Sequence, residues 1–198
     1  MNSEIIIHPK LQHYGLITAN LDTMIDWYRK VLGMTINHRS LVPARAQNRA
    51  PFSAMAFVSN DEVNHRIVFF EVHRAVESDK RRGPLQHVAF AYETFDDLLG
   101  TYARLKDLGI QPGWAADHGV GTAFYYEDPD RNVVELNVSN YGDEWTATEH
   151  LETSPPMLAQ VDPEKMMAAR KAGASPWELH KRASAGEFAP ATPYDPRA

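Results

Sequence analysis

An internal repeat is the feature that most restricts how this chain can fold. The motif Leu-Gln-His opens the apolar stretch 11–18, and it opens the stretch 85–92 again 74 residues later. In each copy an amphipathic helical pattern follows and stops at a glycine, Gly33 in the first copy and Gly109 in the second. The period is too long for a solenoid. It predicts two copies of a strand–helix–three-strand unit whose curved sheets pair.

Hydrophobic periodicity predicts the bounds of the elements in each copy. The first copy is expected to contain a strand over 11–18, a helix over 21–32, and strands over 34–38, 52–59 and 65–73. The second is expected to contain a strand over 85–92, a helix over 95–108, and strands over 110–115, 122–127 and 133–139. The segments 41–51 and 74–83 are expected to be loops. The fold class is therefore α+β, with two βαβββ repeats; two unrelated α+β modules would leave the shared opening motif unexplained.

The repeats occupy about 10–73 and 84–140, within one domain over residues 1–140. Residues 141–198 form a C-terminal extension, rich in Glu, Thr, Pro and Ala, that is too poor in apolar residues for a core of its own. Asp162-Pro163 and Ser175-Pro176 each combine a capping residue with proline at the first helical position, which predicts two helix starts. We expect the extension to be a lid or a contact within a homo-oligomer, and its last dozen residues to be disordered.

Composition excludes several classes of protein. The chain has 198 residues and no cysteine, which rules out disulfides, thiolate zinc sites and iron–sulfur clusters. A net charge of −6 gives no support for nucleic-acid binding. No apolar run approaches the roughly 20 residues that span a bilayer, and the N-terminus does not resemble a signal peptide. A cytoplasmic protein without membrane contact is expected.

Three ionisable residues lie in apolar, strand-like runs: His13, His87 and Glu135. The histidines hold matching positions in the two repeats, so the pseudo-symmetry predicts that both reach one cavity. A carboxylate between Val134 and Leu136 is costly to bury without a cation. Two imidazoles and one carboxylate form the facial triad of non-haem Fe(II) oxygenases, with open coordination positions. The alternatives are two core histidines and a salt bridge from Glu135 to Arg131 or another basic side chain.

With these residues, positions 10–140 resemble the vicinal oxygen chelate superfamily. Within it, the chain looks most like the type I extradiol (catechol) dioxygenases in a one-domain form. The resemblance implies a metal held by His13, His87 and Glu135. It also implies catalytic roles for three further residues: His65 as an acid–base residue, and His118 and Tyr125 as contacts of a substrate hydroxyl. His65 could instead be a turn residue, His118 a surface histidine and Tyr125 a core aromatic residue.

The resemblance implies insertion of O2 into a catechol-type, possibly bulky aryl-substituted, substrate at Fe(II), with Mn(II) as the other metal. One alternative is a glyoxalase-like isomerase or lyase that uses Glu71 as an extra ligand; another is a non-catalytic small-molecule-binding module. Candidate pocket walls are Phe52, Met55, Phe57, Trp114, Phe124 and, in the extension, Trp145, Pro155 and Met157. No role is predicted for the histidines in polar or terminal stretches, which are His8, His38, His73, His150 and His180.

Overall fold

A computed structural model describes residues 10–43, 52–72, 85–141, 146, 148–149 and 158–194. The chain divides into two compact units, Met1–Lys80 and Arg81–Ala198, and each is described by itself. Most of the loop expected at 41–51 and all of the connector expected at 74–83 lie outside the described residues.

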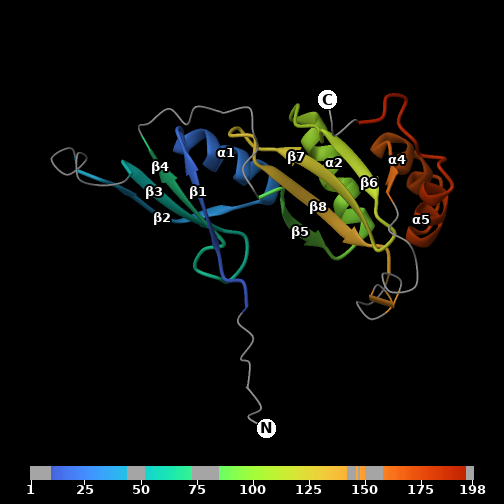
Figure 1. Ribbon diagram of the computed structural model, residues 1–198, viewed down its shortest axis with the longest axis horizontal. Helices are drawn as coiled ribbons and strands as arrows, with labels where there is room; N and C mark the ends of the chain where they lie inside the picture. Colours follow the sequence, from blue (N-terminus) through green and yellow to red (C-terminus); the bar gives the residue numbers. More distant parts are fainter. Residues whose placement is uncertain are drawn as a thin grey trace, which may run out of the picture. The chain divides into compact units, whose positions relative to one another are not determined.

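The first unit is a four-stranded sheet with one helix (Figure 1). Its elements are β1 (Tyr14–Thr18), α1 (Leu21–Leu32), β2 (Thr35–Leu41), β3 (Ala54–Ser59) and β4 (Ile67–Glu71). The strand order is β1-β4-β3-β2. The outer strand β1 runs parallel to β4, whereas β4, β3 and β2 are successively antiparallel. Helix α1 joins β1 to β2 at the opposite edge of the sheet, and the chain returns through β3 to pair β4 with β1.

Helix α1 has the bounds that the sequence predicts. The side chain of Asn20 accepts a hydrogen bond from the Thr23 amide and caps the first turn. Gly33 ends the helix in the left-handed region at φ 67°, and its N–H bonds to the carbonyl of Arg29. The apolar stripe of the helix is buried against the sheet, with the ring of Tyr28 5.1 Å from that of Phe69.

The second unit repeats this arrangement and adds a strand (Figure 1). It contains β5 (Val88–Tyr92), α2 (Phe95–Asp107), β6 (Trp114–Asp117), β7 (Gly121–Glu127), β8 (Val133–Ser139) and β9 (Ala159–Gln160), in the order β5-β8-β7-β6-β9. The pair β5–β8 is parallel, as β1–β4 is in the first unit. The α+β fold class and the two βαβββ repeats are confirmed.

The C-terminal extension packs on the second unit. Strand β9 pairs antiparallel with β6, and the helices α4 (Pro163–Lys171) and α5 (Pro176–Ser184) follow it. Both predicted helix starts are confirmed: Asp162 caps α4, and Ser175 forms a reciprocal capping box with Glu178 at α5. Figure 1 shows the two helices beyond the β6 edge of the sheet.

The predicted disorder of the last dozen residues is wrong for the part that the structure describes. Phe188 is 2% exposed, and the ring of Tyr194 stacks on that of Trp114 at 5.6 Å. Gln160 donates to the carbonyl of Tyr194 and accepts from its amide. Single aromatic side chains fix this segment, and average composition does not reveal such anchors.

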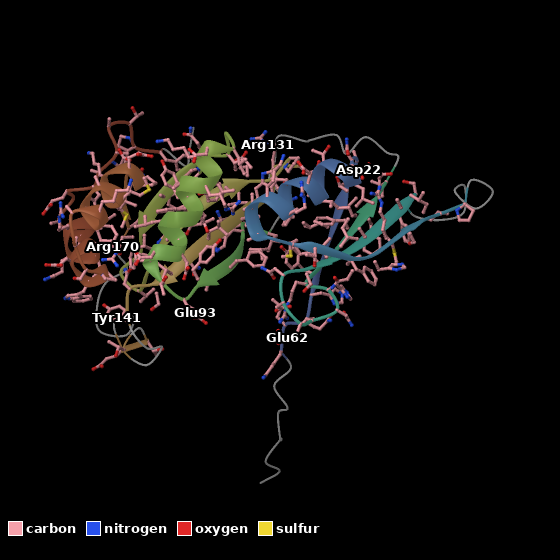
Figure 2. All side chains as sticks on the ribbon, turned by 180° about the vertical axis from the view of Figure 1, so that it is seen from behind. Asp22, Glu62, Glu93, Arg131, Tyr141 and Arg170 are labelled. Carbon is pink, nitrogen blue, oxygen red and sulfur yellow. The ribbon has the colours of Figure 1, made fainter. Side chains whose placement is uncertain are left out.

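Charged contacts also join the extension to the sheet domain. Arg170 of α4, labelled in Figure 2, donates from Nε and Nη2 to the two carboxylate oxygens of Asp96 in α2, both at 2.7 Å. This bidentate geometry fixes the direction of approach more than it adds stability, because the Asp96 side chain is 61% exposed and the Arg170 side chain 32%. None of the helices in the described part of the chain is long and apolar enough to cross a membrane.

If α4 is part of the second unit's core, truncation of its buried methionine should destabilise the whole unit. Met166 is 0% exposed, so Met166→Ala should lower the free energy of unfolding by about 2–5 kcal/mol. Urea denaturation followed by circular dichroism measures the change. Lys171→Ala, on the exposed side of the same helix, is the matched control and should leave the midpoint unchanged. Equal midpoints for the two variants would show that α4 does not belong to the core.

Candidate active site

The sheet of the second unit has two different faces. On one face, Phe124 and Leu136 are fully buried, and the ring of Phe124 lies 5.7 Å from that of Tyr102 in α2. Side chains alternate along a strand, so the neighbouring residues Tyr125 and Glu135 point to the other face. These two residues are direct cross-strand partners in the β7–β8 pair. We call the face that carries Tyr125 and Glu135 the open face.

His87 and Glu135 meet on the open face. His87 lies just before β5, and the parallel register pairs Ala89 of that strand with Glu135. His87 Nε2 is 2.9 Å from Glu135 Oε2. The second carboxylate oxygen, Oε1, accepts a hydrogen bond of 2.8 Å from the side-chain amide of Asn137, two residues along the same face. Asn137 therefore fixes the carboxylate so that Oε2 faces the imidazole.

The glutamine of the repeated Leu-Gln-His motif has the same contact in both copies. Gln86 Oε1 accepts a hydrogen bond from His87 Nδ1, and Gln12 Oε1 accepts one from His13 Nδ1. A proton held at Nδ1 leaves the lone pair of Nε2 as the donor to a metal, which is how a neighbouring acceptor sets the tautomer of a metal-binding histidine.

The donor set of the second unit fits a cation. With Nδ1–H bonded to Gln86, both Nε2 of His87 and Oε2 of Glu135 present electron pairs to each other across 2.9 Å. A proton or a metal ion between them satisfies both. Ligands in adjacent octahedral positions, each about 2.1 Å from an ion, lie about 3.0 Å apart, close to the observed separation. Within either unit, no three described His, Asp or Glu side chains are grouped closely enough to hold a metal by themselves.

Tyr125 and His118 form a polar pair beside this donor set. The Tyr125 hydroxyl and His118 Nε2 share a hydrogen bond of 2.8 Å, and the Tyr125 ring lies edge-on to that of His87. Burial raises the pKa of Tyr125, and the charge of Glu135 raises it further. Burial also lowers the pKa of His118. Both groups are therefore neutral near pH 7, so each can donate a hydrogen bond to a bound hydroxyl or accept one from it.

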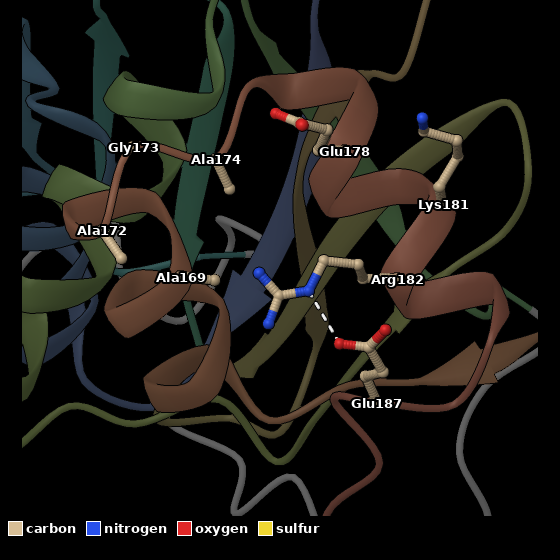
Figure 3. Close-up of a pocket in the computed structure, with 8 residues that line it drawn as sticks. All are labelled: Ala169, Ala172, Gly173, Ala174, Glu178, Lys181, Arg182 and Glu187. Carbon is tan, nitrogen blue, oxygen red and sulfur yellow. Dashed lines mark hydrogen bonds and ion pairs between the residues drawn. The ribbon is translucent and has the colours of Figure 1, made fainter.

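A cavity of about 510 Å³ opens on these residues. Its lining includes His87, His118, Tyr125 and Glu135, together with Thr148 from the C-terminal extension. A different cavity of about 540 Å³ lies between α4 and α5, where Arg182 pairs with Glu187 (Figure 3). The residues that line this second cavity include none of the predicted site residues.

In the first unit, His13 and His65 lie together. Their ring centroids are 4.3 Å apart, and the ring of His65 stacks on that of Phe57, also at 4.3 Å. His65 Nδ1 is 2.6 Å from Oδ1 of Asn64, which leaves Nε2 as the acceptor nitrogen. Desolvation lowers the pKa of His65, and the neighbouring His13 lowers it further. His65 is thus a neutral base in contact with an aromatic surface.

Comparisons with known proteins identify the family of the chain. A sequence model of the Glyoxalase/Bleomycin resistance protein/Dioxygenase superfamily matches residues 10–136. The chain belongs to this superfamily. It is 32% identical over 183 residues to biphenyl-2,3-diol 1,2-dioxygenase 3 of Rhodococcus globerulus, with 89% of this chain and 90% of the relative covered. It is 31% identical over 193 residues to biphenyl-2,3-diol 1,2-dioxygenase 2 of the same organism, with 93% and 94% covered.

Solved structures show the same fold at lower identity. A glyoxylase/bleomycin resistance protein/dioxygenase domain from Frankia sp. EAN1pec is 21% identical, with a TM-score of 0.57, over 70% of this chain and 97% of that one. A genomically encoded fosfomycin resistance protein from Listeria monocytogenes is 18% identical, with a TM-score of 0.53, over 67% and 95%. These likenesses concern the superfamily fold alone.

Glu71 does not occupy the position in the first repeat that corresponds to Glu135. In the second repeat Glu135 pairs with Ala89, two residues after His87. The counterpart of Ala89 in the first repeat is Gly15, and its partner is Val68. Glu71 lies three positions further, on the helix-covered face. Its Oε2 accepts the Leu21 amide at 2.9 Å at the start of α1, and its Oε1 accepts the Ser53 hydroxyl at 3.1 Å. The carboxylate thus has a structural role, which removes the main support for a glyoxalase-like ligand set.

Of the predicted pocket walls, Phe52 and Met55 belong to the first unit, and Trp114 and Phe124 lie on opposite faces of the second sheet. Phe52 is half-buried, and its ring lies 5.0 Å from the tilted ring of Phe70, the cross-strand partner of Met55. Trp114 stacks on Tyr125 at 4.0 Å and nearly parallel, on the open face. Phe124 as a pocket wall is wrong: it is 0% exposed on the opposite face, because adjacent residues of β7 point in opposite directions. Trp145, Pro155 and Met157 lie outside the described residues.

Several contacts were not predicted from the sequence. The sequence could have indicated the contacts of Gln12 and Gln86, because both residues belong to the repeated Leu-Gln-His motif. It could also have indicated that of Asn137, which lies two residues after Glu135 and so on the same face of the strand. His180, for which no role was predicted, is 6% exposed and bonds to Asp117. Its contact spans 63 residues, and nothing in the local pattern around His180 indicates it.

The face assignment can be checked by stability. Phe124→Ala should lower the free energy of unfolding by about 3–5 kcal/mol, because it empties a fully buried ring from the core. Trp114→Ala, on the open face, should cost less because the indole is only half-buried. Chemical denaturation of the two variants measures both values. The reverse order would contradict the assignment of Phe124 to the core face and of Trp114 to the open face.

Proposed function

We propose that this protein is an extradiol ring-cleaving dioxygenase that acts on an aryl-substituted catechol of the 2,3-dihydroxybiphenyl type. The observation that carries the proposal is the pair His87–Glu135, which faces the same cavity as the pair Tyr125–His118. One pair offers metal donors and the other offers hydrogen bonds to a phenolic hydroxyl. The reaction adds both atoms of O2 to the ring and breaks the carbon–carbon bond beside the diol.

The metal we propose is Fe(II), held by His13, His87 and Glu135, with Mn(II) as the other candidate. The assignment of His87 and Glu135 rests on their 2.9 Å approach, and that of His13 on its equivalence to His87 in the repeat, including the glutamine at Nδ1. Bound to two neutral ligands and one anion, Fe(II) would supply open positions at which the diol binds as an anion and O2 is activated.

The substrate class is inferred from the relatives and from the cavity. Both relatives are named as dioxygenases of biphenyl-2,3-diol, and they cover nearly the whole chain. A cavity of about 510 Å³ is within the range of small-molecule sites and large enough for a two-ring diol. The ring of Tyr125, which stacks on the indole of Trp114, is the aromatic part of the cavity lining against which the second ring would pack.

The chain's own residues would orient the substrate and move protons. Tyr125 and His118, already joined at 2.8 Å, would hold one hydroxyl of the diol between them. His65 presents Nε2 as an acceptor, because its Nδ1 bonds to Asn64, and would exchange a proton with the reacting oxygen atoms. Phe57, stacked on the His65 ring, keeps that imidazole in a fixed plane and excludes water from one of its faces.

The test is anaerobic reconstitution with Fe(II), followed by O2 uptake and absorbance with 2,3-dihydroxybiphenyl and catechol. We expect uptake of one O2 per diol and a yellow ring-opened product. Glu135→Gln should abolish uptake and metal retention, because the anionic ligand is lost. Glu71→Gln, the matched acid-to-amide change, should retain the metal and turnover. Isomerisation of methylglyoxal–glutathione without O2 uptake, or metal lost from Glu71→Gln and kept by Glu135→Gln, would contradict the proposal.

The contact of Gln86 with His87 Nδ1 predicts an effect on metal affinity. Gln86→Leu removes the acceptor that fixes the tautomer of His87, and affinity for Fe(II) should fall about tenfold. Anaerobic competition with a chromophoric chelator measures this. Gln111→Leu makes the same change at an exposed glutamine and should keep the original affinity. Equal affinities in the two variants would rule out a role for Gln86 in preparing the ligand.

A further inference from the structure

The carboxylate of Asp117 lies at the end of β6 and is completely buried, at 0% exposure. It accepts hydrogen bonds from the Gly119 amide at 2.7 Å, the Thr122 hydroxyl at 3.3 Å and the Asn140 side-chain amide at 3.1 Å. A buried carboxylate is stable only when its oxygens are bonded in this way. The group is therefore a hydrogen-bonded polar centre in the interior of the second unit.

His180 of α5 completes this centre from the C-terminal extension. Its Nδ1 donates to Asp117 Oδ2 at 2.8 Å, and its side chain is 8% exposed. The rings of Trp177 and Tyr141 lie 5.0 Å and 6.3 Å from the imidazole and cover it (Tyr141 is labelled in Figure 2). The bond connects positions 63 residues apart, so a residue outside the βαβββ repeat enters a network within the repeat.

The same network holds the turn that carries His118. His118 directly follows Asp117, and its amide bonds to the carbonyl of Gly121 at 2.8 Å. Asn140 donates to the carbonyl of Gly119 at 2.9 Å, and its own amide bonds to that of Val120. The turn 117–121 is thus closed by its own backbone hydrogen bond and is held to Asp117 or Asn140 at Gly119 and Val120, which restricts the backbone that carries His118.

We propose that His180 is a positioning residue for the ring-cleavage site. Through Asp117 it holds His118 at hydrogen-bond distance from the Tyr125 hydroxyl. The inference rests on the proposed function for the part His118 and Tyr125 play with the diol. It adds that the C-terminal extension, by α5, sets the geometry of substrate binding and is more than a cover for the sheet edge.

A purely structural role for His180 predicts a different result. If the imidazole only attached α5 to the sheet, its loss would lower stability without moving His118. A positioning role predicts a change in the environment of the His118 ring and weaker diol binding in a protein that remains folded. It also predicts that His180→Asn keeps the function, because the Asn side-chain amide places a donor where Nδ1 of the histidine was. His180→Gln places its amide nearer the position of Nε2 and should therefore lose the function.

The experiment compares His180→Asn, His180→Gln and His180→Leu in the full chain, each shown to be folded by circular dichroism and urea denaturation. Ring-nitrogen spectra of ¹⁵N-histidine-labelled protein, with His118→Ala for assignment, report the His118 environment without any turnover. Steady-state O2 uptake with 2,3-dihydroxybiphenyl gives KM and kcat. The double variant His118→Ala/His180→Leu tests whether the two residues act through one another.

We expect His180→Gln and His180→Leu to shift the His118 ring signals and to raise KM about tenfold, with kcat within about threefold of the original value. His180→Asn should remain within about threefold in both constants. In the His118→Ala background, His180→Leu should add nothing further. Unchanged His118 signals in folded His180→Gln and His180→Leu, or fully additive effects in the double variant, would overturn the proposal. A wild-type chain without O2 uptake would refute the proposed function, while the ring signals would still decide the positioning role.

Discussion

The parallel pairing of the first and last strands of a repeat is the constraint on which the site depends. In the second unit, β5 lies beside β8 in a register that pairs Ala89 with Glu135. That register brings the imidazole of His87 to 2.9 Å from the carboxylate of Glu135, although 48 residues separate them along the chain. The strand period then determines the rest, because Tyr125, opposite Glu135 on β7, must share its face. A shift of one residue would move each of these groups into the apolar layer under α2.

Residues that contact the proposed metal ligands determine how those ligands are protonated and oriented. Gln86 sets the proton on the far nitrogen of His87, and Asn137 turns the carboxylate of Glu135 toward the imidazole. Gln86 directly precedes His87, and Asn137 lies two positions after Glu135. The local backbone therefore fixes each pair of side chains relative to one another. The Asp117 centre works over a longer distance, since it joins α5 to the turn of His118. The cavity is therefore organised by short local contacts on one side and by a long-range contact on the other.

The sequence predicted the elements better than it predicted what faces the cavity. The bounds of α1 followed from its cap at Asn20 and its glycine stop, which are local signals. Phe124 was misplaced because a continuous run of buried residues in β7 hides the alternation that would separate the faces. Glu71 was hard to assess because its partners, the Leu21 amide and Ser53, come from other elements. His180 gave no signal, since its burial depends on packing of the extension against the sheet.

Strand β9 also changes what the second sheet can do at its edge. Unpaired backbone groups along an edge strand are a template onto which another polypeptide can add. Here the chain uses residues of its own extension to pair with Ala116 and Asp117 of β6. Intermolecular growth of the sheet at these positions would require β9 to leave first. Strand β9 thus protects the backbone groups of β6 beside the buried Asp117 from pairing with another polypeptide.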